Sequence, residues 1–504
     1  MSVIVCISTG LQTPELEIML SKAQSAIDAG QSTVVATCAG GSGYACSLNI
    51  YGLNSICATC RSQTRRGLDS LRGNYEHVET PAQVALPSAA LSKDRVLENR
   101  WSLKDYSFEN IDVGQAAYSS YIGLSRDQDL EGGLAIWSLR RLLATSEALV
   151  VWARMMLTHH AAHRVVLYNG RQNQYRPLLR VAQQMKIPVE VMEFSGQHAG
   201  CVYTFENQLP QDLGVLNGSI QARWLSFDGD AKQCAADYYT YKRSGGVIND
   251  SKAYVLGQQA GLLPVDWDAS KHNIAIFNSS EDEFAALGGE YDKTLYRNQT
   301  EAITRLCESL HDDPDVVLWL RIHPNLKDIG WSFATRLRDL QPKHANVRVI
   351  AGDSPVSSYS LLDACAITLS FGSTMGVEAA YWGKPSILVG RSVYERLGSV
   401  YTPKTHEEVV ALVRRRDLAA LPVEGAYKVA LFWSKGGHSL PGFTGDRATG
   451  FRFAGRLFGK TLWEKLSYGL GKFLEKAILG ELINFGLRRA KANLGEEGDA
   501  LSDR

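Results

Sequence analysis

The stretch SFGSTMGVEAAYWGKPSILVG (370–390) decides the fold that the sequence predicts for its second half. A short apolar run, AITLSF (366–371), leads into a Gly-Ser-Thr turn, and the turn opens a helix that ends before a second apolar run, PSILVG (385–390). Strand, helix and strand in this order predict a βαβ unit of a parallel sheet. In such sheets ligands bind where the carboxyl ends of strands meet the first turns of helices. The Gly-Ser-Thr turn is therefore predicted to lie at a ligand-binding edge.

The same alternation continues on both sides of this stretch. Between residues 273 and 416, β-branched runs predict strands and runs with helical spacing predict helices. In chain order these are strand 273–280, helix 300–310, strand 315–323, helix 330–340, strand 347–352, helix 359–365 and, after the quoted stretch, helix 406–416 with Thr405 as its N-cap. The pattern predicts an α/β domain built on a parallel sheet.

The first half of the chain shows this pattern a second time. Strands are predicted at 3–8, 32–38, 163–170 and 187–194, with helices at 14–30 and 176–186. We therefore predict two Rossmann-like, doubly wound α/β domains facing a cleft, with a hinge near 245–270. The predicted boundaries are 1–250 for an N-terminal domain, 251–440 for a C-terminal domain and 441–504 for a basic amphipathic helical tail.

Composition limits the classes of function. A chain of 504 residues is too long for one ordinary core. The 53 basic and 53 acidic residues balance, so no overall field favours nucleic acid as a partner. Nine cysteines are too few for a disulfide scaffold at this length and fit a reducing compartment. Neither a signal peptide nor an apolar run of about 18 residues is visible, so we expect the protein on the cytoplasmic side.

The chain changes character from about residue 445, where apolar residues at helical spacing alternate with cations. The apolar residues are Leu462, Leu466, Leu470, Phe473 and Leu474, and the cations are Lys460, Lys465, Lys472, Lys476, Arg488 and Arg489. A basic amphipathic helix can lie on an anionic bilayer, which predicts peripheral attachment to the inner face of the cytoplasmic membrane. The alternative is a helix that packs across the two domains and leaves its basic face in water.

Four residues of the quoted stretch are candidates for binding. Gly372 can let the backbone approach a ligand, and the Ser373 and Thr374 hydroxyls can cap the helix or bind a phosphate at its positive end. Glu378, one turn further along, can accept hydrogen bonds from ribose hydroxyls if its side of the helix lines the cleft. Taken alone, the same residues fit an ordinary N-cap and a surface glutamate.

Three further loops of this domain follow strands and are predicted to reach the same edge. Their polar residues are Arg321, His323 and Asn325 in RIHPNL (321–326), Ser279 and Ser280 in NSSEDEF (278–284), and Asp353 and Ser354 after the strand at 347–352. A histidine at a strand end can donate a hydrogen bond to a phosphate, although a structural histidine is the alternative. The convergence of four polar loops on one edge predicts a nucleotide site.

As an ordered set these motifs resemble the C-terminal donor domain of GT-B glycosyltransferases. The set is NSSEDEF, RIHPNL, GDSPVSSYSLLDAC (352–365), FGSTMGVEAAYWGKPSILVG (371–390) and YTPKTHEEVVALV (401–413). More narrowly, the chain is similar to bacterial capsule and lipopolysaccharide (O-antigen) biosynthesis proteins. Its His-Pro and Ser/Thr motifs resemble those of transferases that use CMP-activated sugars, including Kdo and sialyl transferases. The resemblance covers about 273–412 and is looser in the N-terminal half.

The resemblance implies that the N-terminal domain receives the acceptor and supplies a general base. Asp112 is the first candidate for this base and Glu193 the second, and a turn residue bonded to its own backbone is the alternative for Asp112. Asn169 and Arg171 are expected on the acceptor side, where the Arg171 guanidinium suits an anionic group. A surface arginine is the competing interpretation of Arg171.

Four cysteines, Cys38, Cys46, Cys57 and Cys60, allow a structural zinc site because the last two have CxxC spacing. The irregular outer spacing favours free buried thiols instead. No DxD-like pair stands in a suitable loop, so we expect a metal-independent reaction and no cofactor besides the nucleotide-sugar substrate.

These observations predict a glycosyltransferase that moves a sugar from a nucleotide-activated donor to a glycan or lipid-linked acceptor in bacterial surface polysaccharide (capsule or lipopolysaccharide) biosynthesis. His323 and the amides at 373–374, with Arg321 or Lys384 as further cations, would stabilise the leaving phosphate. A nucleotide-sugar 2-epimerase of the same architecture is the enzymatic alternative. A non-catalytic scaffold for polysaccharide assembly is the alternative from another class.

Overall fold

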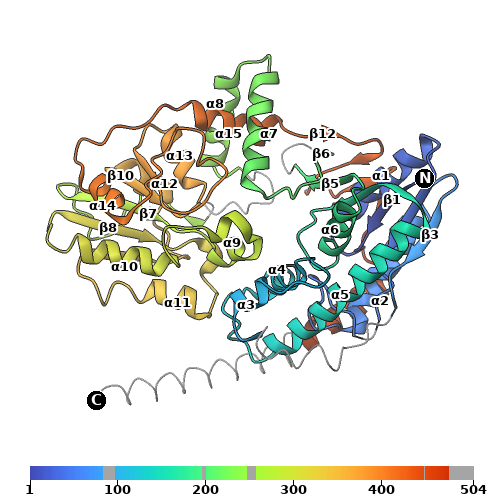
Figure 1. Ribbon diagram of the computed structural model, residues 1–504. Helices are drawn as coiled ribbons and strands as arrows, with labels where there is room; N and C mark the ends of the chain where they lie inside the picture. The colour runs from blue at the N-terminus through green and yellow to red at the C-terminus, as the bar shows by residue number, and fades with distance from the viewer. Residues whose placement is uncertain (42, 83–96, 196–199, 247–256, 448, 476–504) are drawn as a thin grey trace, which may run out of the picture. The chain divides into compact units, whose positions relative to one another are not determined.

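The computed structural model describes residues 1–41, 43–82, 97–195, 200–246, 257–447 and 449–475 (Figure 1). Over these residues the chain is a mixed α/β protein with largely parallel sheets, and it divides into two compact units. Unit 1 comprises the described residues of Met1–Phe194, His198–Pro210 and Gly437–Arg504. Unit 2 comprises those of Ser195–Gln197 and Gln211–Gly436.

The units differ from the predicted domains at both boundaries. Helices α7 (Leu213–Ser226) and α8 (Ala231–Arg243) pack against α15 (Glu424–Lys435), which places them in unit 2. Strand β12 (His438–Ser439) pairs antiparallel with β6 (Cys201–Glu206), which joins the segment after Gly436 to unit 1. The predicted hinge near 245–270 falls within unit 2, and its residues 247–256 lie outside the described part of the chain.

Unit 1 is built on a seven-stranded sheet with the order β12-β6-β5-β4-β1-β2-β3. Its parallel strands are β1 (Ser2–Ile7), β2 (Thr33–Thr37), β3 (Glu76–Glu79), β4 (Ala162–Tyr168) and β5 (Val189–Phe194). Successive strands move away from β1 in one direction up to β3, and β4 then returns to the other side of β1. The carboxyl ends of β1 and β4 are therefore a topological switch point, where open α/β sheets bind ligands.

Helices and a small antiparallel sheet complete unit 1. The helices are α1 (Glu15–Asp28), α2 (Asn54–Leu68), α3 (Arg100–Lys104), α4 (Val113–Ser125), α5 (Ala135–His159), α6 (Arg176–Gln184) and α16 (Leu462–Leu474). The small sheet is β13 (Phe443–Thr444), β14 (Arg452–Phe453) and β15 (Arg456–Leu457), and it packs against α1.

Unit 2 is built on a five-stranded, fully parallel sheet with the order β11-β10-β7-β8-β9. The strands are β7 (His272–Phe277), β8 (Val316–Arg321), β9 (Val347–Ile350), β10 (Ile367–Ser370) and β11 (Ser386–Leu388). The connecting helices include α9 (Glu281–Leu287), α10 (Gln299–Ser309), η4 (Pro324–Leu326), α11 (Ser332–Arg338), α12 (Ser358–Ala364), α13 (Met375–Tyr381) and α14 (His406–Arg414). The strand order reverses between β7 and β10, which makes a second switch point.

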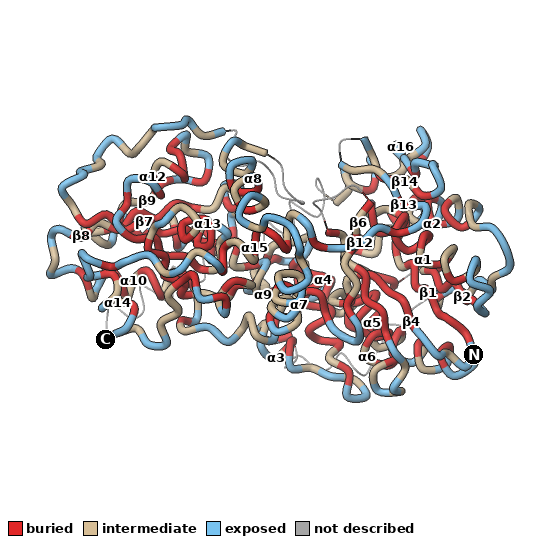
Figure 2. The backbone as a smooth tube through the Cα atoms, turned by 90° about the horizontal axis from the view of Figure 1, so that it is seen from above, coloured by how far each residue is buried: buried red, intermediate tan, exposed pale blue. Residues whose placement is uncertain are grey.

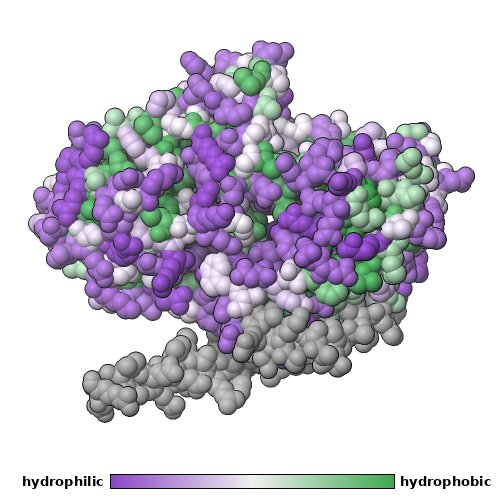
Figure 3. Space-filling model, in the orientation of Figure 1, coloured by the Kyte–Doolittle hydropathy of each residue, from purple (hydrophilic) through white to green (hydrophobic). Residues whose placement is uncertain are grey.

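The apolar runs that predicted strands form the buried layer of each unit. Every residue of β1, β2, β7 and β10 is buried, and Figure 2 shows the central strands in red beneath more exposed helices. Hydrophilic side chains cover most of the face shown in Figure 3. None of the described helices is both long and apolar enough to cross a bilayer. The predicted cleft between two domains stays a prediction.

Candidate functional site

Three loops meet at the carboxyl edge of the unit 2 sheet. Strand β7 lies between β10 and β8, and its last residue, Phe277, is in register with Ser370 on one side and Arg321 on the other. The loops that follow these strands are therefore neighbours at one edge. They begin at Asn278, Ile322 and Phe371.

Hydrogen bonds join the three loops directly. The Ser279 hydroxyl donates to the Phe371 carbonyl at 2.9 Å, the His323 backbone N–H donates to Asn278 Oδ1 at 2.6 Å, and Asn325 Nδ2 donates to Ser280 Oγ at 3.4 Å. Residues predicted from separate motifs thus come together at the switch point. The loop after β9 lies one strand further along, because β9 is the edge strand beyond β8.

The hydrogen bonds of His323 define its tautomer. The side chain is half-buried, and its Nδ1 atom accepts a hydrogen bond from the Asn325 backbone N–H at 3.1 Å. A neutral imidazole that accepts at Nδ1 carries its proton at Nε2. His323 therefore carries a hydrogen-bond donor at Nε2, and its predicted bond to a phosphate stays a prediction.

The Gly372-Ser373-Thr374 turn is fixed mainly by packing within the protein. Gly372 has a φ of +103°, and a Cβ atom there would lie 2.6 Å from the Arg391 carbonyl oxygen and 2.9 Å from the Phe284 ring. The glycine is thus required by backbone conformation and close packing, so its predicted approach to a ligand is not what explains it. Ser373 Oγ accepts from the Met375 N–H at 3.3 Å, and Tyr394 OH donates to the Ser373 carbonyl at 2.5 Å.

Glu378 is not the exposed acceptor of ribose hydroxyls that the sequence predicts. Its side chain is buried, and Lys242 Nζ lies 2.6 Å from Oε1. The Thr374 hydroxyl also donates to Oε1, at 2.9 Å, and Tyr359 OH donates to Oε2. Since both carboxylate oxygens already accept from protein groups, Glu378 acts here as the counter-ion that holds Lys242 against the start of α13.

The two cations predicted to stabilise a leaving phosphate have other partners. Arg321 is buried, and its guanidinium donates to the carbonyls of Ala351 and Ser354, so it fixes the loop after β9. Burial lowers the pKa of Arg321 to about 10. Lys384 Nζ donates to the Asp363 carbonyl at 2.6 Å and to the Cys365 carbonyl at 3.1 Å. These carbonyls precede β10, at the opposite edge of the sheet, so Lys384 does not serve this site.

Charge at this edge is uneven. Glu281, Asp282 and Glu283 occupy the first turn of α9, where they suit the helix dipole but oppose a bound anion. Asn325 Nδ2 donates to Glu283 Oε1 at 2.7 Å. The first turn of α9 is therefore the more negative part of this edge.

The carboxyl edge of the unit 1 sheet is acidic. Glu193, near the end of β5, accepts from Asn169 Nδ2 at 2.6 Å and from Tyr168 OH at 3.1 Å. Asn169 follows β4 with a φ of +57°, a left-handed conformation that recurs at functional sites. The Arg171 backbone N–H donates to Asn169 Oδ1 at 3.4 Å. Three residues predicted for the acceptor side thus lie together beside the β1–β4 switch point.

Two buried glutamates beside this edge were not among the residues predicted from the sequence. Glu15 and Glu17 lie in the first turn of α1 at 1% and 0% exposure, and Glu15 Oε1 and both Glu17 oxygens have no hydrogen-bond partner among the described residues. Burial, with the Glu193 and Glu17 carboxylates nearby, raises the pKa of Glu15 well above its usual value. Burial raises the pKa of Glu17 to about 7. No sequence signal identified them, because acids in the first turn of an amphipathic helix are ordinarily exposed to solvent.

Asp112 has the environment of a structural ion pair. It lies at the N-cap position of α4, and its carboxylate accepts from Arg176 at 2.6 Å and from Arg180 at 3.3 Å. Burial alone would raise the pKa of Asp112, but the two guanidinium groups outweigh it and lower the pKa to about 2. A carboxylate held in this way is a poor proton acceptor, so the geometry does not favour Asp112 as the base.

Three of the four cysteines considered for zinc accept hydrogen bonds from separate N–H groups. Gly10 N–H donates to Cys60 Sγ at 3.2 Å, Asn49 Nδ2 donates to Cys57 Sγ at 3.2 Å, and Gly40 N–H donates to Cys38 Sγ at 3.3 Å. All nine cysteines are free thiols, and the described residues include no group of three ligands arranged for a metal ion. Free thiols, the interpretation favoured by spacing, fit this geometry, and the zinc alternative is not supported.

The described part of the predicted tail is the helix α16. Its polar side faces α2: Gly471 packs on Ser55 and Ile56, and Glu464 forms an ion pair with Arg66 at 2.7 Å. Its apolar side chains face outward, with exposed fractions from 58% to 81% for Leu462, Trp463, Leu466, Leu470 and Phe473. Among the described residues, α16 therefore belongs to unit 1 and presents an apolar face. Lys476, Arg488 and Arg489 lie outside the described residues.

No protein-family model matches the chain, and no curated protein sequence matches it. Among solved structures it is similar to a KpsC beta Kdo 2,4 transferase of Thermosulfurimonas dismutans, at 14% identity over 53% of this chain and 79% of that one, with a TM-score of 0.36. It is also similar to the UDP-bound MnaA of S. aureus, at 11% identity over 96% and 98% of the chains, with a TM-score of 0.25. The UDP-GlcNAc 2-epimerase of Neisseria meningitidis bound to UDP-GlcNAc is 13% identical over 85% and 94%, with a TM-score of 0.26.

Proposed function

We propose that this protein is a metal-independent glycosyltransferase of GT-B type, which transfers a sugar from a nucleotide-activated donor to a glycan or lipid-linked acceptor in bacterial surface polysaccharide biosynthesis. Unit 2 binds the donor, and unit 1 receives the acceptor. The observation that carries the proposal is the hydrogen-bonded convergence of the loops after β7, β8 and β10 at a topological switch point.

The donor site is expected to stabilise the leaving nucleotide phosphate. His323 supplies its Nε2–H as a donor, and the hydroxyls of Ser373 and Ser280 lie on the neighbouring loops, whereas the Ser279 hydroxyl already donates to the Phe371 carbonyl. Donors fixed in place before the reaction stabilise the charge that develops on the leaving oxygen without reorganisation. The carboxylates of α9 can accept hydrogen bonds from hydroxyl groups of the ligand, and the Asn325 amide can accept or donate them.

The general base is assigned to Glu193 rather than to Asp112. Tyr168 and Asn169 hold the Glu193 carboxylate in a defined orientation, whereas the Asp112 carboxylate is bound by the guanidinium groups of Arg176 and Arg180. Glu15 is a second buried carboxyl group close enough to influence it. Neighbouring carboxyl groups separate their pKa values, which keeps one of them ready to accept a proton near neutral pH.

A donor screen tests the proposal. The full chain is titrated with CMP-, UDP- and GDP-sugars by calorimetry, and one nucleotide class is expected to bind and to raise the melting temperature. Ser373→Ala should weaken that binding by about tenfold, since it removes a hydrogen bond to a charged group. Ser270→Ala, an exposed serine of the same unit, is the matched control and should change nothing. If none of the three nucleotide classes binds, the transferase proposal is contradicted and the non-catalytic scaffold is the remaining alternative.

Product analysis separates the transferase from the epimerase. Incubated with donor alone, a 2-epimerase converts the donor sugar at C2, whereas a transferase leaves it largely intact until an acceptor is added. Conversion of the donor without an acceptor would therefore contradict the transferase assignment while keeping the nucleotide-sugar site.

We also propose that α16 recruits the protein to an anionic membrane surface. An amphipathic helix with its apolar face outward can bury Leu466 and Leu470 at the lipid boundary. Its two acids are already paired, Glu464 with Arg66 and Glu475 with Lys472, so Lys460 and the exposed Lys465 leave this segment with a positive charge. Cosedimentation with vesicles containing phosphatidylglycerol should be lost in Leu466→Ser/Leu470→Ser. It should be kept in Leu225→Ser, a leucine of α7 that is even more exposed.

A further inference from the structure

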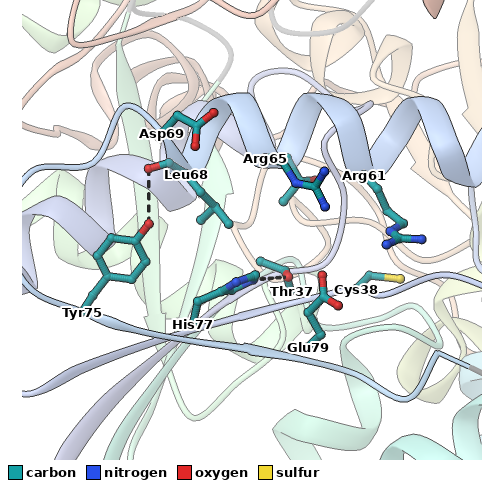
Figure 4. A pocket seen from close by; sticks show the side chains of 10 residues that line it. Thr37, Cys38, Arg61, Arg65, Leu68, Asp69, Tyr75, His77 and Glu79 are labelled. Atoms are coloured by element: carbon teal, nitrogen blue, oxygen red, sulfur yellow. Dashed lines mark hydrogen bonds between the residues drawn. The ribbon is translucent and has the colours of Figure 1, made fainter.

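A cavity of about 680 Å³ lies in unit 1 between α2 and the edge strand β3. The end of β2 and the Tyr75 ring also line it (Figure 4). None of the proposed donor or acceptor residues takes part in it. The cavity therefore needs its own explanation.

Two arginines dominate one wall. Arg61 and Arg65 stand one turn apart on α2, so both side chains project from the same side of the helix. Figure 4 shows both guanidinium groups directed toward the strands opposite. Neither has an ion-pair or hydrogen-bond partner among the described residues, although each offers a planar set of donors that matches a phosphate or a carboxylate.

The opposite wall supplies acceptors and a fixed histidine. His77 Nε2 and Thr37 Oγ1 are hydrogen-bonded at 2.8 Å, which orients both groups beneath the arginines. The Glu79 carboxylate points to the same space in Figure 4. A bare anion would be attracted by Arg61 and Arg65 but repelled by Glu79 and by Asp69, which also lines the cavity. A molecule that carries an anionic group next to hydroxyls would satisfy both walls, because carboxylates accept hydrogen bonds from hydroxyls.

We propose that this α2 pocket binds a sugar bearing a phosphate or a carboxylate, with Arg61 and Arg65 on the anionic group and Glu79 on the hydroxyls. The choice of a sugar rests on the proposed function, whereas the anion chemistry rests on the pocket itself. The site is separate from the donor edge of unit 2, so it would hold part of an anionic acceptor glycan rather than the nucleotide.

Binding to the full chain tests this proposal at constant ionic strength, which keeps screening equal between samples. The probes are glucose 1-phosphate, glucuronate, inorganic phosphate and glucose, and calorimetry measures the affinity of each. We expect one of the two anionic sugars to bind more tightly than phosphate, and glucose to show no binding. Arg61→Gln/Arg65→Gln should weaken that binding by about tenfold or more, since it removes two charge-assisted contacts.

Arg72→Gln is the control, because Arg72 is an exposed arginine just after α2 that does not line the pocket. Glu79→Gln should reduce the preference for the anionic sugar over inorganic phosphate. No binding of either anionic sugar, equal binding by the double variant, or equal affinity for phosphate alone would each overturn the proposal. Donor titration of the double variant should match wild type, so loss of the nucleotide site and loss of this pocket remain distinguishable.

Discussion

The two sheet edges share a strand order but differ in chemistry. In both units the order reverses at the first strand, between β1 and β4 and between β7 and β10. The unit 2 edge carries hydroxyls, an amide and an imidazole that are tied together by hydrogen bonds. The unit 1 edge carries Glu193, with Glu15 and Glu17 buried beside it.

This difference suits the two edges to different chemical roles. Fixed neutral donors suit a group that gains negative charge, as a leaving phosphate does. Buried carboxyl groups with raised pKa values suit proton transfer near neutral pH, because their proton affinity approaches that of the medium. Under the proposed function, the same topology would serve anion binding in one unit and proton transfer in the other.

Glu193→Gln is the strongest test of the proton-accepting edge. The amide keeps the shape of the side chain but cannot accept a proton, so the transfer rate should fall by about a thousandfold while donor affinity stays unchanged. Steady-state kinetics and donor calorimetry measure both quantities. Glu206→Gln, an exposed glutamate on β6, is the control, and a rate equal to wild type in Glu193→Gln would remove Glu193 from the mechanism.

His323→Ala tests the anion-binding edge. Loss of one fixed donor should lower kcat by about a hundredfold, with a smaller change in KM, because the bond strengthens as charge develops. His311→Ala, at an exposed histidine of the same unit, should behave as wild type. Equal loss of activity in both variants would point to general damage rather than to the site.

Glu17→Gln tests whether the acids of unit 1 titrate near neutral pH. The folded pKa of Glu17 is about 7 and the ordinary value is 4.5, so this carboxyl costs stability that grows as the pH rises through that interval. The variant should be more stable than wild type by about 2–3 kcal/mol at pH 8 and equal to it at pH 4. Urea unfolding at the two pH values measures this, and a difference that does not depend on pH would contradict it.

Asp112→Asn should show the opposite dependence and the smallest effect. The folded pKa of Asp112 is about 2 against 3.8, so its stabilisation is present above pH 3.8 and is lost as the pH falls toward 2. The side chain is 37% exposed, so solvent screening reduces the expected loss at pH 7 to about 1 kcal/mol. Retained transferase activity in this variant would agree with its structural role, whereas a large loss of activity at full stability would return Asp112 to the list of bases.

Much of the unit 2 fold could be predicted from sequence, because each apolar run there is short, buried and followed by a helix with clear spacing. The strands predicted at 273–280 and 315–323 correspond to β7 and β8, and those at 347–352 and 366–371 correspond to β9 and β10. The convergence of their loops followed from the rule that parallel strands end at one edge.

The roles of single side chains were harder to predict. Arg321 and Glu378 occupy suitable positions in the motifs, yet Arg321 binds the Ala351 carbonyl and Glu378 binds Lys242. Lys242 comes from a helix more than a hundred residues earlier, so no local pattern could pair it with Glu378. The limits of the compact units differ from the predicted domain boundaries for the same reason, because they depend on contacts between segments that are distant in the chain.

Because unit 1 is built from segments at both ends of the described chain, the two units can complete their folding at different times during synthesis. Unit 2 is encoded almost entirely by one continuous segment, Gln211–Gly436, and can begin to fold once that segment has emerged. Unit 1 cannot be complete before the segment after Gly436 has emerged, since β12 adds to its sheet and the Pro441 carbonyl accepts from the Ser21 hydroxyl of α1 at 2.6 Å. A message that stops at codon 436 should therefore yield a folded second unit attached to an incomplete, protease-sensitive first one.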